Sequence, residues 1–207
     1  MSGYDSIKLG PARKKEFKAL PAGKYGTSKQ SALKLVNYNG AFTSEKAPDL
    51  VRHSYLVASV NGTEGTAFRQ IQINPAWLSR EWIVAAFGYE DAQANQSAVT
   101  TIQRAVALRA ANRARENNTP AEQMEEATQT AYNNFMQQVQ IAIGDIWHLL
   151  DWLSRDREEI LSNFDFASLV GAEFSGTVVD GYKPGTSEVK SIYGKSKAKQ
   201  ATPVAVA

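Results

Sequence analysis

Residues 119–153 repeat apolar side chains at helical spacing, and they lie between two groups of β-prone segments. Steps of three and four residues place these side chains on one face of a helix that runs for more than about five turns. The apolar stripe consists of Tyr132, Phe135, Met136, Val139, Ile143, Ile146, Trp147, Leu150 and Leu153. We expect it to pack against the strands, a partner helix or another subunit, because an isolated helix cannot leave such a face in water.

The residues before this helix predict three strands. Lys24–Val36 follows a turn at Pro21–Gly23 and reads as a long, mostly polar strand. A loop is expected next, because Asn39–Gly40 and Ala47–Pro48–Asp49 carry turn residues. Arg52–Val60 and Thr66–Ile73 then alternate around a short loop that contains Gly62 and Gly65, which predicts a β-hairpin.

The remaining segments complete an α+β order of elements. Pro75 opens a short helix, and residues 92–116 are rich in Ala, Gln and Arg and predict another. Phe174–Val179 and Ser187–Tyr193 predict two last strands. Five strands with helix between the third and the fourth are typical of an OB-type β-barrel, here with a large helical insertion.

The expected organisation has five parts. They are a basic arm at 1–19, the first part of the barrel with its short helix at 20–90, the helical insertion at 91–165, the last two strands at 166–193 and a flexible basic tail at 194–207.

Composition narrows the class of protein. The chain has no cysteine, which excludes disulfides, thiolate catalysis and every Cys-based metal site. No run of about 18 apolar residues is present, and the first residues lack an apolar leader, so we expect neither a membrane span nor secretion. Residues 1–52 carry ten Lys or Arg and four Asp or Glu, whereas residues 91–167 carry six and eleven. Basic ends around an acidic middle favour a polyanionic partner, although an ordinary solvated surface has the same look.

Catalytic and metal-binding patterns are missing from the sequence. His53 and His148 have no second ligand at metal spacing, so we expect no metal and no cofactor. The acidic pairs lie on expected helices among arginines, as on a solvated helix face with local ion pairs. We therefore expect no catalytic residues and no enzyme activity.

The expected strands instead combine cations with aromatic rings, the two requirements for holding single-stranded nucleic acid. Alternation puts Leu56, Ile71 and Ile73 in the core and turns Tyr55 and Phe68 outward as stacking surfaces, with Arg52 and Lys34 beside them. The same aromatics are compatible with core positions. The predicted DNA-binding residues are Lys24, Tyr25, Lys29, Lys34, Arg52, Tyr55, Phe68, Tyr182, Lys183, Lys190 and Tyr193.

Phrases at both ends resemble a known family. Residues 20–25 read LPAGKY, 169–171 read LVG and 188–193 read EVKSIY, in the order found in phage-encoded OB-fold single-stranded-DNA-binding proteins. The resemblance implies a viral protein of DNA replication or recombination, located in the cytoplasm of the host cell, with other replication proteins as possible partners. The long insertion departs from the short members, and the acidic tail of many single-strand binders is absent.

Together these features predict a sequence-independent single-stranded-DNA-binding protein that forms homo-oligomers through the helical insertion. The alternative is a virion structural or assembly protein whose insertion makes subunit contacts and whose basic arms meet packaged DNA.

Overall fold

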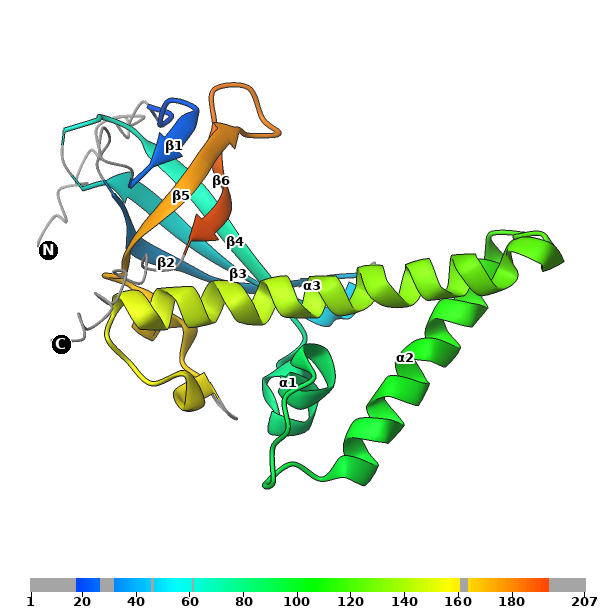
Figure 1. The fold of residues 1–207 in the computed structure, drawn as a ribbon. Helices are drawn as coiled ribbons and strands as arrows, with labels where there is room; N and C mark the ends of the chain where they lie inside the picture. The colour runs from blue at the N-terminus through cyan, green and yellow to red at the C-terminus, as the bar shows by residue number, and fades with distance from the viewer. Residues whose placement is uncertain (1–17, 27–31, 46, 61, 161–163, 194–207) are drawn as a thin grey trace, which may run out of the picture.

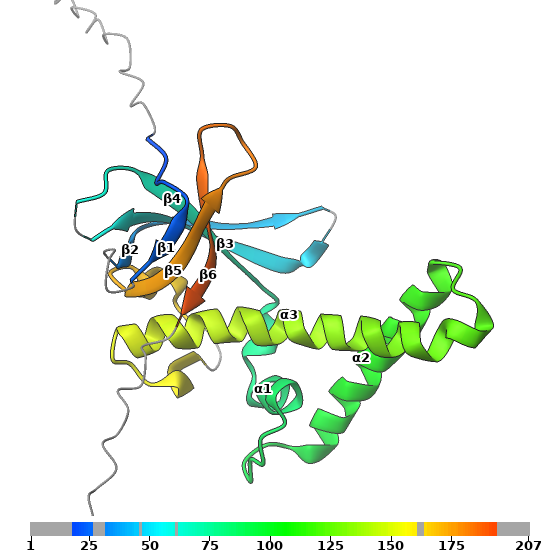
Figure 2. The same cartoon turned by 45° about the horizontal axis from the view of Figure 1, so that its top comes forward.

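The computed structural model describes residues 18–26, 32–45, 47–60, 62–160 and 164–193. It combines a six-stranded mixed sheet with three α-helices, which makes it an α+β fold. In Figure 1 the strands form a curved group, and the longest helix runs beneath it and far beyond it. Figure 2 shows that the hairpin of the second and third strands projects from this group in the same direction as the helices.

The strands are β1 (Gly23–Tyr25), β2 (Leu33–Ser44), β3 (Ala47–Ser59), β4 (Thr66–Ile73), β5 (Glu173–Asp180) and β6 (Ser187–Tyr193). Their order in the sheet is β1-β5-β2-β3-β4-β6, and β5 also pairs with β6. Strands β2, β3, β4, β6 and β5 therefore form a ring, to which β1 adds a short sixth strand.

The ring is uneven. Neighbours β2–β3, β3–β4 and β5–β6 pair over most of their length, but β2 meets β5 at only two residue pairs. Strand β4 runs parallel to β6 and pairs with it at one position, Phe68 with Glu188. Beyond that position the edge of β4 faces a helix instead of a strand.

The helices all lie between β4 and β5. They are α1 (Arg80–Phe87), α2 (Gln96–Glu116) and α3 (Met124–Trp152), with short 3-10 turns before α1 and α3. Ser79 and Asn95 cap α1 and α2 through side-chain oxygens that accept backbone N–H bonds. Helices α2 and α3 form a long V, and α1 fills the space between its open ends (Figure 1).

The apolar stripe of α3 packs within the chain. Val139, Ile143 and Ile146 are fully buried, and Phe135 and Trp147 pack half-buried against the same core. The C-terminal half of α3 contacts β4, β5 and β6, and the N-terminal half contacts α2. The stripe therefore needs no second subunit to cover it, and this removes the physical reason given above for association through these residues.

Two expectations about the early strands are wrong. The expected strand at residues 24–36 is divided, since β1 ends at Tyr25 and β2 begins at Leu33. The expected loop at residues 39–40 and 47–49 belongs to the ends of β2 and β3. Register shifts after Leu35 and Tyr38 add one residue each, and Gly40 adopts a positive φ of 99°, so the strand continues through turn-forming residues.

The β3–β4 hairpin is confirmed, although β3 begins five residues before the predicted strand, and β4 and the last two strands are confirmed within a residue. The predicted parity of β3 is wrong. Tyr55 and Val57 point into the ring and are fully buried, whereas Leu56 lies on the outer side. On β4 the parity is right, because Ile71 and Ile73 are buried and Phe68 lies opposite Leu56 on the outer side. Direct cross-strand pairs share one face, so Phe68 and Tyr55 lie on opposite faces.

Candidate nucleic-acid interface

The outer face of β2, β3 and β4 consists of four cross-strand rows. In order along the strands these are Phe42–Arg52–Gln72, Gly40–Ser54–Gln70, Asn37–Leu56–Phe68 and Lys34–Ala58–Thr66. None of these side chains is buried, whereas the alternate positions carry the core of the ring. We call this four-row surface the outer face.

An aromatic ring stands at each of two places on the outer face. Phe42 is 43% exposed, and the guanidinium of Arg52 lies over its ring, 5.9 Å from the centroid. Phe68 lies two rows away and is half-buried. Since each row is two residues further along a strand, the two rings are about 13 Å apart in the strand direction.

The surface between the Phe42 and Phe68 rings is flat. The row that separates them contains a glycine, a serine and an exposed glutamine, Gly40, Ser54 and Gln70. Such a surface leaves room for a planar group against Phe42 and offers hydroxyl and amide groups to its edge.

Cations stand at both ends of the outer face. Arg52 belongs to the first row and Lys34 to the last. The Lys34 ammonium lies 3.2 Å from the Glu173 carboxylate, and both side chains are nearly half exposed. An exposed pair of this kind is weak and can exchange partners with a passing phosphate. The structure thus brings together Lys34, Arg52 and Phe68, three of the predicted residues.

Two predicted aromatics are structural. Tyr55 has no exposed surface, and its hydroxyl donates a hydrogen bond to the Phe166 carbonyl at 2.9 Å. Burial raises the pKa of Tyr55 strongly. Tyr25 is 3% exposed and donates to the Pro21 carbonyl at 2.9 Å. Neither ring has a free face on which a base could stack, so their assignment as stacking residues is wrong.

The turn between β5 and β6 carries a second group. Tyr182 is 96% exposed, and the neighbouring Lys183 is also exposed. Lys190 is exposed on β6, and its carbonyl accepts a bond from Arg69. These residues belong to the β5–β6 turn and to β6, whereas the rows of the outer face belong to β2, β3 and β4.

Lys24 and Tyr193 form a third group. The Tyr193 hydroxyl lies 2.7 Å from the hydroxyl of Thr177, and Lys24 is the cross-strand partner of the same threonine. Both side chains are exposed. Lys29, the remaining predicted residue, lies outside the described residues.

A buried histidine lies on the inner face of the β2–β3 hairpin. His53 is 8% exposed, its ring stacks on Phe166 with centroids 3.4 Å apart, and its Nδ1 lies 2.9 Å from the Tyr38 hydroxyl. Burial lowers the pKa of His53 from 6.5 to about 4. Its place in the core accounts for it without a ligand. Within the described residues no group of three or more His, Asp or Glu side chains is placed to hold a metal ion.

Phe42 is the residue that sequence reasoning missed. It fell in the expected loop, so no face was assigned to it. The available signal was Gly40 in a polar, otherwise β-prone stretch, since a glycine inside a strand often marks a bulge. The first shift in β2 turns Tyr38 inward, and the second restores the earlier alternation, so Phe42 lies on the same outer side as Lys34.

No protein-family model, curated protein or solved structure matches this chain. Among the described residues, no helix combines the length and the apolar character that crossing a bilayer requires.

Proposed function

We propose that the protein binds single-stranded DNA without sequence preference. The observation that carries this proposal is the outer face, where Phe42 and Phe68 are separated by about 13 Å along the strand direction over a flat polar surface. Base stacking on aromatic rings is tolerant of sequence, because every base has a π-face. Arg52 and Lys34 at the two ends supply cations for phosphates.

The ring itself supports an OB-type assignment. Its strand order, the parallel β4–β6 pair and helices inserted between the third and fourth ring strands are the arrangement expected of an OB-type barrel. In that architecture the outer side of the second and third strands, here β3 and β4, is the usual oligonucleotide face. We therefore propose the outer face as the binding surface, within a phage protein of replication or recombination.

The alternative, a virion or assembly protein, depended on subunit contacts made by the helical insertion. The apolar stripe of α3 is covered inside the chain, so that argument loses its main observation. For this reason the virion or assembly function remains the second candidate.

Titration of fluorescent oligo-dT at several salt concentrations tests the proposal. Affinity should fall as salt rises, with a slope near −0.7 for each phosphate contact, as for other single strands. Duplex DNA of the same length should bind more weakly, because paired bases cannot reach the rings. A flat salt response, or equal affinity for duplex and single strand, would contradict the proposal.

A further inference from the structure

A groove runs along α3 from the tip of the helical V to the edge of β4. Its outer part is a cavity of about 660 Å³ between α2 and α3, and its inner part is a cavity of about 490 Å³ between α3 and the sheet. Gln138 and Ile141 line both, so the two cavities adjoin at these side chains. From Gln123 to Asp145 the groove follows roughly 33 Å of helix.

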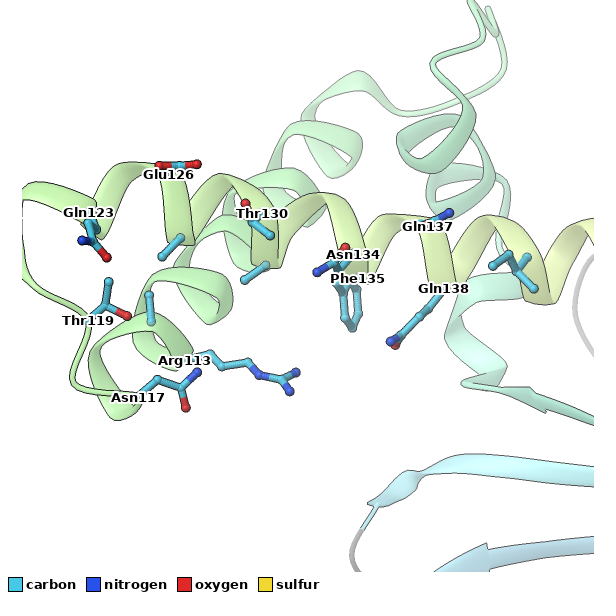
Figure 3. A pocket seen from close by; sticks show the side chains of 14 residues that line it. Arg113, Asn117, Thr119, Gln123, Glu126, Thr130, Asn134, Phe135, Gln137 and Gln138 are labelled. Atoms are coloured by element: carbon cyan, nitrogen blue, oxygen red, sulfur yellow. The ribbon is translucent and has the colours of Figure 1, made fainter. Parts of the chain in front are cut away.

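The groove opens toward the projecting hairpin. Figure 3 shows Arg113, Phe135 and Gln138 directed to the side of the helices on which the β2–β3 hairpin lies. Leu50, near the base of that hairpin, lines the inner cavity. Residues of α3 and Leu50 of the hairpin therefore border the same inner cavity, and Figure 2 shows the hairpin and the helical V projecting in the same direction.

The inner end of the groove meets the outer face. Gln70 and Gln72 belong to the first two rows of the outer face, and they also line the inner cavity. A chain that lies across Phe42 and Arg52 can therefore pass over these glutamines into the groove without leaving the surface.

Side-chain amides are the most frequent polar groups of the lining, and they come from α3, from the segment that precedes it and from β4. They include Gln70, Gln72, Asn117, Gln123, Asn134 and Gln138. Each amide offers two donor hydrogens and an acceptor oxygen, which suits the donor and acceptor edges of unpaired bases. At the outer end Arg113 adds an exposed cation and Glu126 an exposed carboxylate. Arg69 and Asp145 at the inner end neutralise each other.

An apolar partner fits this groove poorly. The centre of a protein–protein contact is usually enriched in aromatic and other apolar side chains. Here Ile141 is the one large apolar side chain of the lining that is mainly exposed among the described residues. Phe135 also lines the groove, but its ring makes a T-shaped contact with Trp77, with ring centroids 5.8 Å apart, and the guanidinium of Arg109 lies over it.

We propose that the groove holds the continuation of the DNA strand bound on the outer face, so that the helical insertion is a DNA-contacting arm. This inference rests on the proposed function. The outer face binds by stacking and phosphate contacts, and the groove adds hydrogen bonds from amides to base edges. The DNA strand leaves the outer face of the β-sheet at Gln70 and Gln72 and follows α3 toward Arg113.

Binding to oligo-dT of increasing length, from roughly 6 to 30 nucleotides, tests the inference. The variant Asn134→Asp with Gln138→Glu keeps the size of both side chains and places two negative charges in the groove. The matched control, Gln129→Glu with Asn133→Asp, makes the same changes on α3 at residues that line neither cavity. For the natural protein, affinity should rise with length beyond what the outer face can hold.

The groove variant should bind the shortest oligonucleotides as the natural protein does and the longest ones about tenfold or more less tightly. The control should follow the natural protein at every length. A groove variant that binds long oligonucleotides normally would overturn the inference. The same holds if the variant changes the oligomer mass measured by light scattering but leaves the DNA affinity unchanged. Failure of the natural protein to bind oligo-dT at any length would overturn the proposed function as well.

Discussion

Arg69 of β4 and Asp145 of α3 form a buried ion pair where the ring meets the helical insertion. The Arg69 guanidinium also donates to the carbonyls of Val189 at 2.9 Å and Lys190 at 3.1 Å. Strands β4 and β6 stop pairing at Phe68, one residue earlier. A side chain thus replaces the missing ladder bonds and fastens β4, β6 and α3 together. Burial lowers the pKa of Arg69 to about 10.

Asp145→Asn should therefore destabilise the fold strongly. The amide keeps the shape of the carboxylate but leaves the buried Arg69 cation without a counter-charge, which costs about 3–5 kcal/mol of unfolding free energy. Urea unfolding followed by circular dichroism measures this loss.

The double variant Arg69→Met with Asp145→Leu is the matched comparison. It removes both charges and should recover part of the lost stability, since replacing a buried ion pair by apolar residues is often nearly neutral. Recovery stays incomplete because the two carbonyls lose their donor. A double variant as unstable as Asp145→Asn would show that the lost contacts, and not the unpaired charge, set the cost.

Gly65 should tolerate alanine much less than Gly62 does. Both glycines have positive φ, 124° and 92°, so both substitutions carry backbone strain of on the order of 1 kcal/mol. A Cβ on Gly65 would also lie 2.6 Å from the Ala19 carbonyl oxygen, whereas one on Gly62 meets nothing within 4 Å. Relief of that clash would break the bonds that hold the segment before β1 against β4, which the Leu20 N–H donates to the Thr66 carbonyl and the Thr66 N–H donates to the Lys18 carbonyl.

Thermal unfolding of the two alanine variants measures the difference. Gly65→Ala should lose at least about 2 kcal/mol more than Gly62→Ala, a difference of several degrees in midpoint for a domain of this size. Equal midpoints would mean that the segment before β1 moves aside without cost.

The helices and strands of the second half could be predicted from the sequence because each segment has one strong local pattern. The α3 stripe has a helical period over its whole length, and β5 and β6 alternate between turn residues. The resemblance to single-strand-binding proteins, in contrast, remains an expectation from short phrases.

The binding surface was harder to predict because the sequence leaves the inward side of β3 ambiguous and because Phe42 fell in an expected loop. Alternation alone cannot tell which side of Arg52–Val60 is inward, since Leu56 and Tyr55 both suit a core. The answer is decided by a distant group, the Phe166 carbonyl that receives the Tyr55 hydroxyl. Likewise, the groove beside α3 is lined by residues of six elements, two of them 3-10 turns, and no local sequence pattern predicts it.

Stability should fall as the solution is acidified from pH 6.5 to pH 4.5. Burial lowers the pKa of His53 from 6.5 to about 4, so in this window the unfolded chain binds a proton that the folded chain does not. The free energy of unfolding should drop by roughly 2 to 3 kcal/mol. Burial also lowers the pKa of His148, which adds to the drop.

Urea unfolding at several pH values checks this, with His53→Gln as the comparison. The variant removes the titrating ring, so its stability should change much less over the same window. An unchanged slope in His53→Gln would assign the effect to other groups.

Phe42→Ala and Tyr55→Phe should separate DNA binding from stability. Phe42 is 43% exposed and packs mainly with Arg52, so its truncation should cost less than about 1 kcal/mol of stability. If bases stack on its ring, oligo-dT affinity should fall about fivefold to a hundredfold, the value of one base–aromatic stack. Tyr89→Ala, which removes another exposed ring on the connection after α1, should leave affinity unchanged.

Tyr55→Phe should behave in the opposite way. The variant keeps the buried ring and removes only the hydroxyl that bonds the Phe166 carbonyl, so it leaves that acceptor unpaired at a cost of about 1–3 kcal/mol. Oligo-dT affinity should not change, because the ring lies on the inner side of the sheet. Thermal unfolding and fluorescence titration of both variants check these expectations, because each variant should change one of the two quantities and leave the other nearly unchanged. Loss of affinity in Tyr55→Phe with none in Phe42→Ala would place the bound strand on a different surface from the outer face.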